Sequence, residues 1–176
     1  PYGMAKRLLH EACETYGRQY SLPCAVLVPA NLYGPEDHFE EEKSHVIPAI
    51  IRRYVEAKDA GLESVSNWGT GSPTREFLHV VDAAEAIAIA AEKDVECVPI
   101  NLGTGIETSI ADLTNIIAQA VGYEGEVEWD ISKPDGQPKR YLDVSRAKEL
   151  LGFEAKISLK DGIQETVEWY RANPVT

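Results

Sequence analysis

One short apolar run constrains the fold of this chain more than any other feature. Residues 24–28 read Cys-Ala-Val-Leu-Val, without the alternation of polar and apolar side chains that marks a strand with one wet face. Such a run is typical of a strand buried on both faces of a parallel sheet. Helix-like segments lie on either side of it, at residues 2–18 and 46–58, and this alternation predicts an α/β fold.

The remainder of the chain also alternates between strand-like and helix-like segments. Strands are expected at residues 63–68, 77–81, 98–102 and 126–129, helices at 83–92, 109–121, 145–151 and 158–171, and loops at 31–44 and 132–138. Asp82 and Ser109 are the expected N-caps of two helices, because a side-chain oxygen there accepts from a first-turn amide. Only residues 24–28 and 98–102 are apolar enough for the middle of a parallel sheet. We therefore expect the chain to be the C-terminal part of a larger α/β protein.

Charge and cysteine content argue against several classes of partner. The chain carries 17 basic and 29 acidic side chains, for a formal net charge of −12. Since no excess positive charge is available to neutralise phosphates, we expect no binding to nucleic acid or to an anionic membrane. No run approaches the roughly 18 apolar residues of a membrane-spanning helix, and the first residues lack a secretory signal. Cys13, Cys24 and Cys97 are widely spaced and odd in number. They predict neither a disulfide framework nor a zinc site, and they fit the reducing cytoplasm.

Tyr2 and Lys6 are separated by four positions on an expected helix, which places both side chains on one helix face. The pKa of a free tyrosine is near ~10, so its phenol is a poor proton shuttle at neutral pH. A neighbouring ammonium group favours the phenolate and makes the side chain usable as an acid or base. The spacing alone is weak evidence, because Tyr54 and Lys58 repeat it, and there decoration of an amphipathic helix is the better interpretation.

The surroundings of the first pair carry more information than its spacing. Pro-Tyr-Gly-Met-Ala-Lys opens the helix at residues 1–6, and the apolar strand that follows ends in Pro-Ala-Asn-Leu-Tyr-Gly-Pro at residues 29–35. These motifs resemble the extended short-chain dehydrogenase/reductase family of nucleotide-sugar epimerases, dehydratases and reductases. The resemblance implies that Tyr2 and Lys6 serve catalysis and hold the nicotinamide ribose.

This resemblance also implies a fold and a division into domains. The expected fold is α/β, the C-terminal part of an extended Rossmann-type, NAD(P)-binding fold with a small mixed α/β substrate-binding domain. Residues 1–31 and 76–103 would be the remainder of the Rossmann domain, and residues 32–75 and 104–176 the nucleotide-sugar domain. The nicotinamide site would be lined by the residues Pro29, Ala30, Asn31 and Leu32. The family's glycine-rich phosphate loop lies upstream of the tyrosine, and no G-x-G-x-x-G element occurs in this chain.

Four further segments narrow the resemblance to the GDP-L-fucose synthase branch of that family. They are Ser-His-Val-Ile-Pro-Ala-Ile-Ile-Arg-Arg at 44–53, Trp-Gly-Thr-Gly-Ser-Pro-Thr-Arg-Glu-Phe-Leu-His-Val at 68–80, Asn-Leu-Gly-Thr-Gly at 101–105 and Ser-Lys-Pro-Asp-Gly at 132–136. This branch epimerises C3 and C5 of GDP-4-keto-6-deoxy-mannose and reduces the C4 ketone with NADPH. The resemblance therefore implies an enzyme with a GDP-sugar substrate, NADP(H) or NAD as cofactor, no metal, and a homodimeric full-length form.

His45 is the candidate acid of this reaction. An imidazole with an ordinary pKa near ~6.5 gives and takes protons at neutral pH. The resemblance implies that His45 reprotonates the sugar carbon during epimerisation and borders the cofactor site. From the residues alone, the simpler interpretation is a helix-start histidine hydrogen-bonded to the backbone. No pair of histidines in the sequence has the spacing of metal ligands.

The resemblance implies that four residues contact the substrate, namely Arg53, Trp68, Arg75 and Asp135. Forked guanidinium groups bind diphosphate oxygens in pairs, which suits an acidic protein that takes an anionic ligand. Each residue also has a plain structural interpretation. The arginines can be surface groups paired with neighbouring glutamates, Trp68 can be a hairpin core residue, and Asp135 can form a Pro-Asp-Gly turn.

Two rival functions stay open. A 4-epimerase or 4,6-dehydratase of another nucleotide sugar would share Tyr2 and Lys6 without needing His45. A non-catalytic nucleotide-sugar-binding module would keep the fold alone. The family's partner base, a cysteine upstream of the tyrosine, is matched by none of the three cysteines. Without an upstream phosphate loop, we expect this chain by itself neither to hold NADP(H) tightly nor to turn over.

Overall fold

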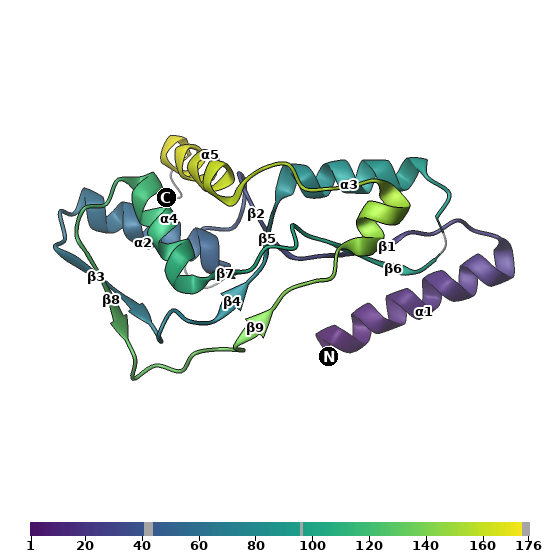
Figure 1. The fold of residues 1–176 in the computed structure, drawn as a ribbon, viewed down its shortest axis with the longest axis horizontal. Coiled ribbons are helices and arrows are strands. Elements are labelled where there is room, and N and C mark those ends of the chain that lie inside the picture. Colours follow the sequence, from purple (N-terminus) through teal and green to yellow (C-terminus); the bar gives the residue numbers. More distant parts are fainter. Residues whose placement is uncertain (41–43, 96, 174–176) are drawn as a thin grey trace.

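Helices gather around three two-stranded parallel sheets and one three-stranded sheet in the computed structural model, which describes residues 1–40, 44–95 and 97–173. The helices are α1 (Tyr2–Tyr20), α2 (Val46–Asp59), α3 (Val80–Glu92), α4 (Ile110–Val121), the π-helical η1 (Ala147–Leu151) and α5 (Leu159–Ala172). The strands are β1 (Val26–Pro29), β2 (Asn31–Tyr33), β3 (Ser64–Trp68), β4 (Thr74–Arg75), β5 (Phe77–His79), β6 (Pro99–Leu102), β7 (Thr108–Ser109), β8 (Glu126–Asp130) and β9 (Lys139–Arg140). Figure 1 shows an elongated molecule with α2, α4 and α5 towards one end and α1 at the other.

Parallel pairing of strands that are distant in sequence builds the sheet layer. β1 pairs with β6, β2 with β5, and β3 with β8, all in parallel, while β4 pairs antiparallel with β7 and parallel with β9. β1 leads almost directly into β2, and between them the Ala30 amide donates to the Leu102 carbonyl over 2.8 Å. Parallel pairs need crossover connections, which the helices provide here, and they confirm the predicted α/β class.

Two hydrophobic clusters form the core. The larger cluster joins α2, α4 and α5 to β2, β3 and β5, with Ile51, Leu113 and Ile163 fully buried within it. The smaller cluster joins α3, β6 and η1, and includes Leu78 and Phe153. The division into a Rossmann part and a substrate part stays a prediction. Phe153 belongs to the predicted substrate part, but it packs in the smaller cluster with Leu78 and Leu102 of the predicted Rossmann part.

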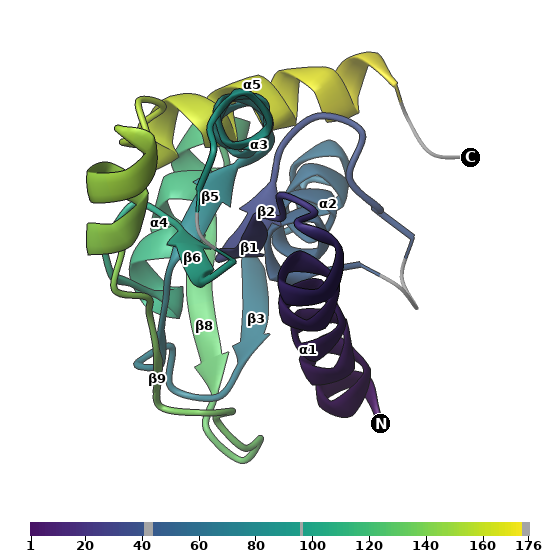
Figure 2. The ribbon, with the colours of Figure 1, turned by 90° about the vertical axis from the view of Figure 1, so that its right-hand side faces the viewer.

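Helix α1 and strand β1 are less buried than the sequence predicts. No residue of α1 is buried, and Leu8 in its apolar stripe is 70% exposed. Val28 of β1 is 40% exposed, so the prediction that residues 24–28 are buried on both faces is wrong for this structure. The reason is that β1 pairs with β6 along one edge, while α1 lies on one side of it (Figure 2).

The junction between β5 and α3 also differs from the prediction. β5 ends at His79, which is itself the N-cap of α3, and its Nδ1 accepts from the Val81 amide over 3.4 Å. Asp82 lies in the first turn and is 2% exposed. Its Oδ2 accepts from the amides of Lys156 and Ile157 over 3.1 and 3.0 Å. The prediction of Asp82 as the cap is wrong because this carboxylate holds the segment before α5.

The remaining boundaries are close to the predictions, with a few differences. Ser109 caps α4 as predicted, and its hydroxyl accepts from the Asp112 amide over 2.9 Å. The loop expected at residues 31–44 is wrong at its start, where β2 pairs with β5, and residues 41–43 lie outside the described residues. β4, β7 and β9 have no counterpart among the predicted strands, because two residues are too few to show a period.

Candidate active site

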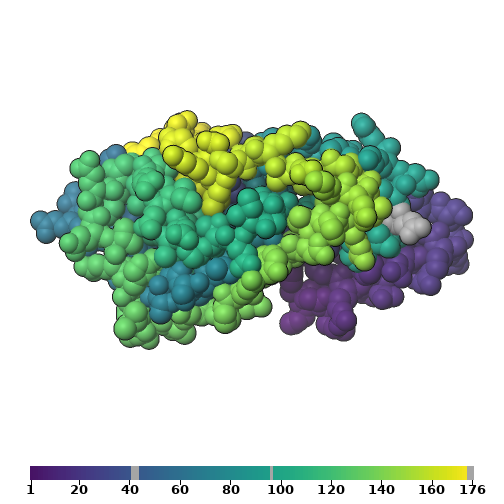
Figure 3. Space-filling model, viewed as in Figure 1, coloured from purple at the N-terminus to yellow at the C-terminus, as the bar shows by residue number. Residues whose placement is uncertain are grey.

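A cavity of about 820 Å³ lies between α1, the stretch from β1 to β2, and the start of α2. It is lined by all the residues predicted for catalysis and cofactor binding, namely Tyr2, Lys6, Pro29, Ala30, Asn31, Leu32 and His45. Arg140, Tyr141 and Leu142 contribute a further wall. In the space-filling view, a recess is visible where the purple start of α1 faces the yellow-green segment near residue 140 (Figure 3). The fold therefore brings Tyr2 and Lys6 of α1 and His45 at the start of α2 into one cavity.

The two Tyr-x-x-x-Lys pairs have opposite surroundings. Tyr2 is 77% exposed in the cavity wall, and the Lys6 Nζ lies 5.4 Å from the centroid of its ring. Tyr54 is fully buried, and its hydroxyl accepts from the Asn67 amide over 2.8 Å. Lys58 donates from its Nζ to the Val121 carbonyl over 2.8 Å. Tyr54 therefore packs in the core and Lys58 bonds the end of α4, which is more than the helix decoration predicted for them. Tyr2 and Lys6 instead line the cavity.

His45 stands at the start of α2 as the sequence predicts. It occupies the N-cap position, and its side chain makes no capping hydrogen bond there. Its Nδ1 lies 3.6 Å from the Asp37 Oδ1, and its side chain is 74% exposed. The alternative of an imidazole bound to the helix backbone is therefore wrong in this structure.

A buried carboxylate that the sequence analysis did not single out supports the cavity wall. Glu76 is 1% exposed, and its Oε1 and Oε2 accept from the Gly105 and Leu142 amides over 2.8 and 2.7 Å. The Asn31 Nδ2 donates to the Glu76 carbonyl over 2.8 Å. Gly103 packs against the carboxylate so closely that a Cβ there would overlap it. The sequence gives one signal for a buried carboxylate here, which is that Glu76 directly precedes the apolar segment at residues 77–81.

A second, smaller hollow collects most of the residues predicted to bind substrate. Its volume is about 100 Å³, and its lining includes Trp68, Arg75 and Asp135. The Arg75 Nη1 donates to the carbonyls of Thr74 and Gln137, over 2.7 Å in each case, so the arginine is braced by backbone rather than by a glutamate. Trp68 is 72% exposed, so the alternative of a hairpin core residue is wrong.

Asp135 is held by two hydrogen bonds from Thr70. Its Oδ1 accepts from the Thr70 amide over 2.8 Å, and its Oδ2 accepts from the Thr70 hydroxyl over 2.7 Å. These two bonds hold the pKa of the Asp135 carboxyl below its ordinary value of 3.8. Arg53 lies outside the described lining of the hollow, and its Nη1 donates to the Asn67 Oδ1 over 3.3 Å. The structure thus brings three of the four predicted substrate residues together.

The cavity and the hollow share a wall. Arg75 lines the hollow and the next residue, Glu76, lines the cavity. In the neighbouring strand β9, Arg140 pairs with Arg75 and lines the cavity, while Asp135 and Gly136 line the hollow on the same segment. Arg140 is a cationic cavity residue that the sequence analysis missed, because two-residue strands give no periodic signal.

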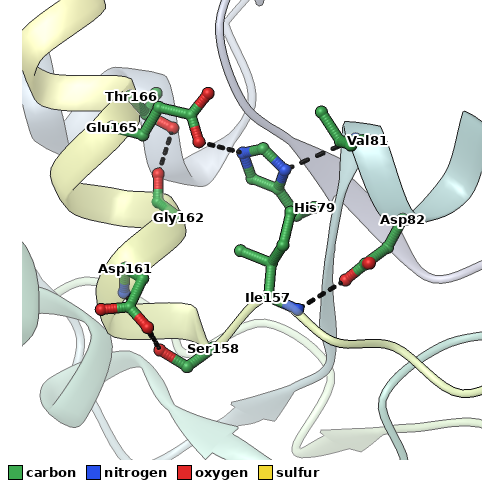
Figure 4. A network of polar contacts seen from close by, with 9 residues as sticks. All are labelled: His79, Val81, Asp82, Ile157, Ser158, Asp161, Gly162, Glu165 and Thr166. Carbon is green, nitrogen blue, oxygen red and sulfur yellow. Dashed lines mark hydrogen bonds and ion pairs between the residues drawn. The ribbon is translucent and has the colours of Figure 1, made fainter.

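Another buried titratable group lies between α3 and α5, away from this cavity. His79 is 1% exposed, and its Nε2 lies 3.7 Å from the Glu165 Oε2 without a hydrogen bond (Figure 4). Burial lowers the pKa of His79 from its ordinary value of 6.5, against the opposing charges of Glu165 and Asp82. Its ring also meets the buried Tyr33 edge-on, at 5.2 Å between centroids. His79 is therefore a core residue.

Two features do not occur in the described ranges. No group of three or more histidine, cysteine or acidic side chains is placed there to hold a metal ion. No helix among the described residues combines the length and the apolar character needed to cross a bilayer. The expectation that the protein uses no metal stays a prediction.

Comparison with known proteins places these residues in a family. The model of the NAD dependent epimerase/dehydratase family matches residues 1–103. GDP-L-fucose synthase from Escherichia coli (strain K12) is 43% identical over 98% of this chain and 56% of its own length. The GDP-L-fucose synthetase from Naegleria fowleri, solved with NADP bound, superposes with a TM-score of 0.87 at 30% identity, over 98% of this chain and 56% of that one.

A relative with a different activity superposes almost as well. UDP-glucose 4-epimerase from Thermotoga maritima, solved with UDP-glucose, has a TM-score of 0.84 at 33% identity, over 98% of this chain and 53% of that one. This chain spans about half the length of the relatives that it matches. The match to the family model covers more than half of the chain. The matched range includes the cavity residues Tyr2, Lys6 and 29–32. The chain therefore belongs to the NAD dependent epimerase/dehydratase family.

Proposed function

We propose that this chain supplies acid–base groups and much of the substrate pocket of an NADP-dependent epimerase/reductase that converts GDP-4-keto-6-deoxy-mannose to GDP-L-fucose. The observation that carries the proposal is the single cavity lined together by Tyr2, Lys6 and His45. The 43% identity to a GDP-L-fucose synthase supports the choice of reaction. We assign this activity to the whole protein and not to this chain alone, because the relatives are about twice as long as the chain.

The cavity suits a nicotinamide cofactor. A phenol and an ammonium group in its wall can hydrogen-bond ribose hydroxyls, and the neighbouring Leu9 and Val28 offer apolar surface to a flat ring. We assign Tyr2 and Lys6 to the ribose, and residues 29–32 with His45 to the surroundings of the nicotinamide. When bound, the cofactor supplies the hydride that reduces the C4 ketone. The NADP-bound relative supports NADP(H) over NAD.

The three acid–base groups divide the proton transfers among them. The Tyr2 hydroxyl donates its proton to the C4 oxygen as the ketone becomes an alcohol, and the Lys6 ammonium stabilises the phenolate that remains. The His45 imidazole protonates the sugar carbon on the side opposite to the proton that was removed, which inverts that centre. Its exposed position without a capping bond leaves it able to face a ligand in the cavity.

The hollow and its shared wall suit the nucleotide diphosphate. Arg75 presents a guanidinium that is already braced by two carbonyls, which reduces the side-chain entropy lost when it binds phosphate oxygens. Trp68 offers an exposed ring for stacking, and Asp135 offers an ionised acceptor. The substrate role of Arg53 rests on the sequence resemblance alone, because Arg53 lies outside the lining of the hollow.

The test follows substrate protons and cofactor oxidation separately. In heavy water, NMR reports deuterium entering C3 and C5 of the sugar, while absorbance reports NADPH oxidation. Tyr2→Phe should lower NADPH oxidation by roughly 10²-fold or more, the usual contribution of a general acid, while deuterium entry continues. His45→Asn should lower deuterium incorporation at least as strongly. Tyr16→Phe, on an exposed tyrosine of the same helix, is the matched control and should change neither rate. Full activity in Tyr2→Phe would contradict the proposal.

The similarity to UDP-glucose 4-epimerase favours a second candidate. A 4-epimerase or a 4,6-dehydratase would need Tyr2 and Lys6 but would tolerate His45→Asn. Turnover of UDP-glucose that survives His45→Asn would therefore select this candidate. A binding module would instead keep its affinity for GDP-sugars in both variants and show no turnover of any sugar nucleotide.

We also propose a homodimer, a cytoplasmic location and the two-part domain division, on the support of the family resemblance. The free thiols of the chain fit a reducing compartment. Light scattering of the protein as its gene encodes it would test the dimer. Hydrogen exchange in increasing denaturant would test the domain division, with residues 1–31 and 76–103 expected to open together and separately from residues 32–75 and 104–176.

A further inference from the structure

Three thiols that are far apart in the sequence meet near the end of α1. Cys13 lies on α1, Cys24 precedes β1, and Cys97 precedes β6, and each thiol is free and partly buried. The pKa of the Cys97 thiol is raised, first by burial and then by the thiols of Cys24 and Cys13, with a smaller contribution from Glu14 and a hydrogen bond with Cys24. The Cys97 thiol therefore lies near the thiols of Cys24 and Cys13.

The register of the parallel strands accounts for this meeting. Val26 pairs with Pro99, and Leu27 pairs with Ile100. Continuing this register back by two residues sets Cys24 opposite Cys97. Neighbouring strands lie about 4.7–4.9 Å apart, and paired residues point to the same face. A disulfide requires Cα atoms roughly 4.4–6.8 Å apart, and the spacing of neighbouring strands falls within this range.

We propose that Cys24 and Cys97 form a reversible disulfide site that clamps the segment between α1 and β1 to the start of β6. Two free thiols on neighbouring segments are the groups that thiol–disulfide exchange needs. The proposal concerns the chain's own thiols and does not depend on the proposed function.

The oxidant is a small disulfide such as glutathione disulfide. The Cys24 thiolate attacks one sulfur of glutathione disulfide, forms a mixed disulfide and releases one glutathione thiolate. The Cys97 thiol loses its proton and attacks the Cys24 sulfur, which breaks the mixed disulfide and releases the second glutathione. Two protein thiols are oxidised, one glutathione disulfide is reduced, and the two protons end on the two glutathione molecules. Because the pKa of Cys97 is raised, the second step should quicken as pH rises.

The clamp would act on the helix that carries Tyr2 and Lys6. α1 has no buried residue, so the segment at residues 21–25 is an important constraint on its position. Joining Cys24 to Cys97 fixes that segment to β6, whose Ile100 and Leu102 belong to the buried core. Oxidation should therefore slow hydrogen exchange at residues 21–25 and leave exchange in α4 unchanged.

Peptide mapping tests the pairing directly. Trypsin places Cys13, Cys24 and Cys97 in three different peptides, covering residues 8–18, 19–43 and 94–139, because the bond before Pro134 resists cleavage. The folded chain is treated with glutathione disulfide, blocked with an alkylating agent and digested without reduction. We expect a cross-linked pair of the second and third peptides, lighter by two hydrogen atoms than their sum, which disappears after treatment with dithiothreitol.

Single substitutions supply the controls. Cys13→Ser should keep the cross-link and the slowed exchange at residues 21–25, whereas Cys24→Ser and Cys97→Ser should lose both. A cross-link that involves mainly the peptide with Cys13 would overturn the pairing that the strand register predicts. Glutathione attached to single cysteines, with no cross-link at any pH between neutral and mildly alkaline, would overturn the disulfide itself.

Discussion

Glu76→Gln is the substitution that best tests how the cavity wall is held. The Glu76 carboxylate is 1% exposed and accepts from the amides of Gly105 and Leu142 over 2.8 and 2.7 Å. Glutamine has the same shape but replaces one acceptor oxygen by an amide group that can only donate. One of the two backbone amides is then left facing a donor. The substitution therefore removes one charge-assisted bond and weakens the other.

The expected loss follows from the energy of such bonds. A hydrogen bond to a charged group contributes roughly 1.5–3 kcal/mol, and an unsatisfied buried amide costs a similar amount. We expect Glu76→Gln to lower the free energy of unfolding by about 1.5–3 kcal/mol. With an m-value of about 2 kcal/mol/M, the urea midpoint should fall by about 1 M.

Urea unfolding followed by circular dichroism measures this loss. Glu124→Gln, on an exposed glutamate in the turn after α4, is the matched control and should stay within about 0.5 kcal/mol of the parent. Hydrogen exchange should also quicken at the Gly105 and Leu142 amides in Glu76→Gln. A midpoint equal to that of the control, with unchanged exchange at both amides, would refute the assignment of Glu76 as the brace of the wall.

Three further changes test other parts of the structure. Gly103→Ala would push a Cβ into the Glu76 carboxylate and should lower the free energy of unfolding by about 1–3 kcal/mol in the same urea assay. Burial lowers the pKa of His79 in the folded chain below the 6.5 of the unfolded chain. As the pH falls, the unfolded chain therefore binds this proton at a higher pH than the folded chain does. The stability present above pH 6.5 should be lost as the pH falls from 6.5 through the folded-state pKa. His79→Asn keeps a capping acceptor and should flatten that part of a plot of urea midpoint against pH. Ser158→Ala removes the hydroxyl that accepts from the Asp161 amide over 3.1 Å and should cost about 1 kcal/mol, measured by thermal unfolding.

Much of the helical and parallel architecture was predictable because it rests on long periodic segments. α2, α4 and α5 each bury one apolar face, and their sequences show that face directly. The short strands β4, β7 and β9 were not predictable, because two residues carry no period and their pairing depends on partners far along the chain. Glu76 was missed for the same reason, since its two amide donors lie 29 and 66 residues away.

The two Tyr-x-x-x-Lys pairs show how far local spacing determines function. Both pairs lie on helices, at the same separation, so the spacing predicts the same side-chain geometry for each. The difference comes from what surrounds the helix. α2 packs against α4 and β3, so Tyr54 must be buried, and its hydroxyl is bonded to Asn67. α1 has no such cover, and Tyr2 stays in the wall of a cavity whose other residues come from β1, β2 and the start of α2. A motif of two residues therefore becomes a candidate site through the segments that follow it, which is why the stretch after the apolar strand was more informative than the pair itself.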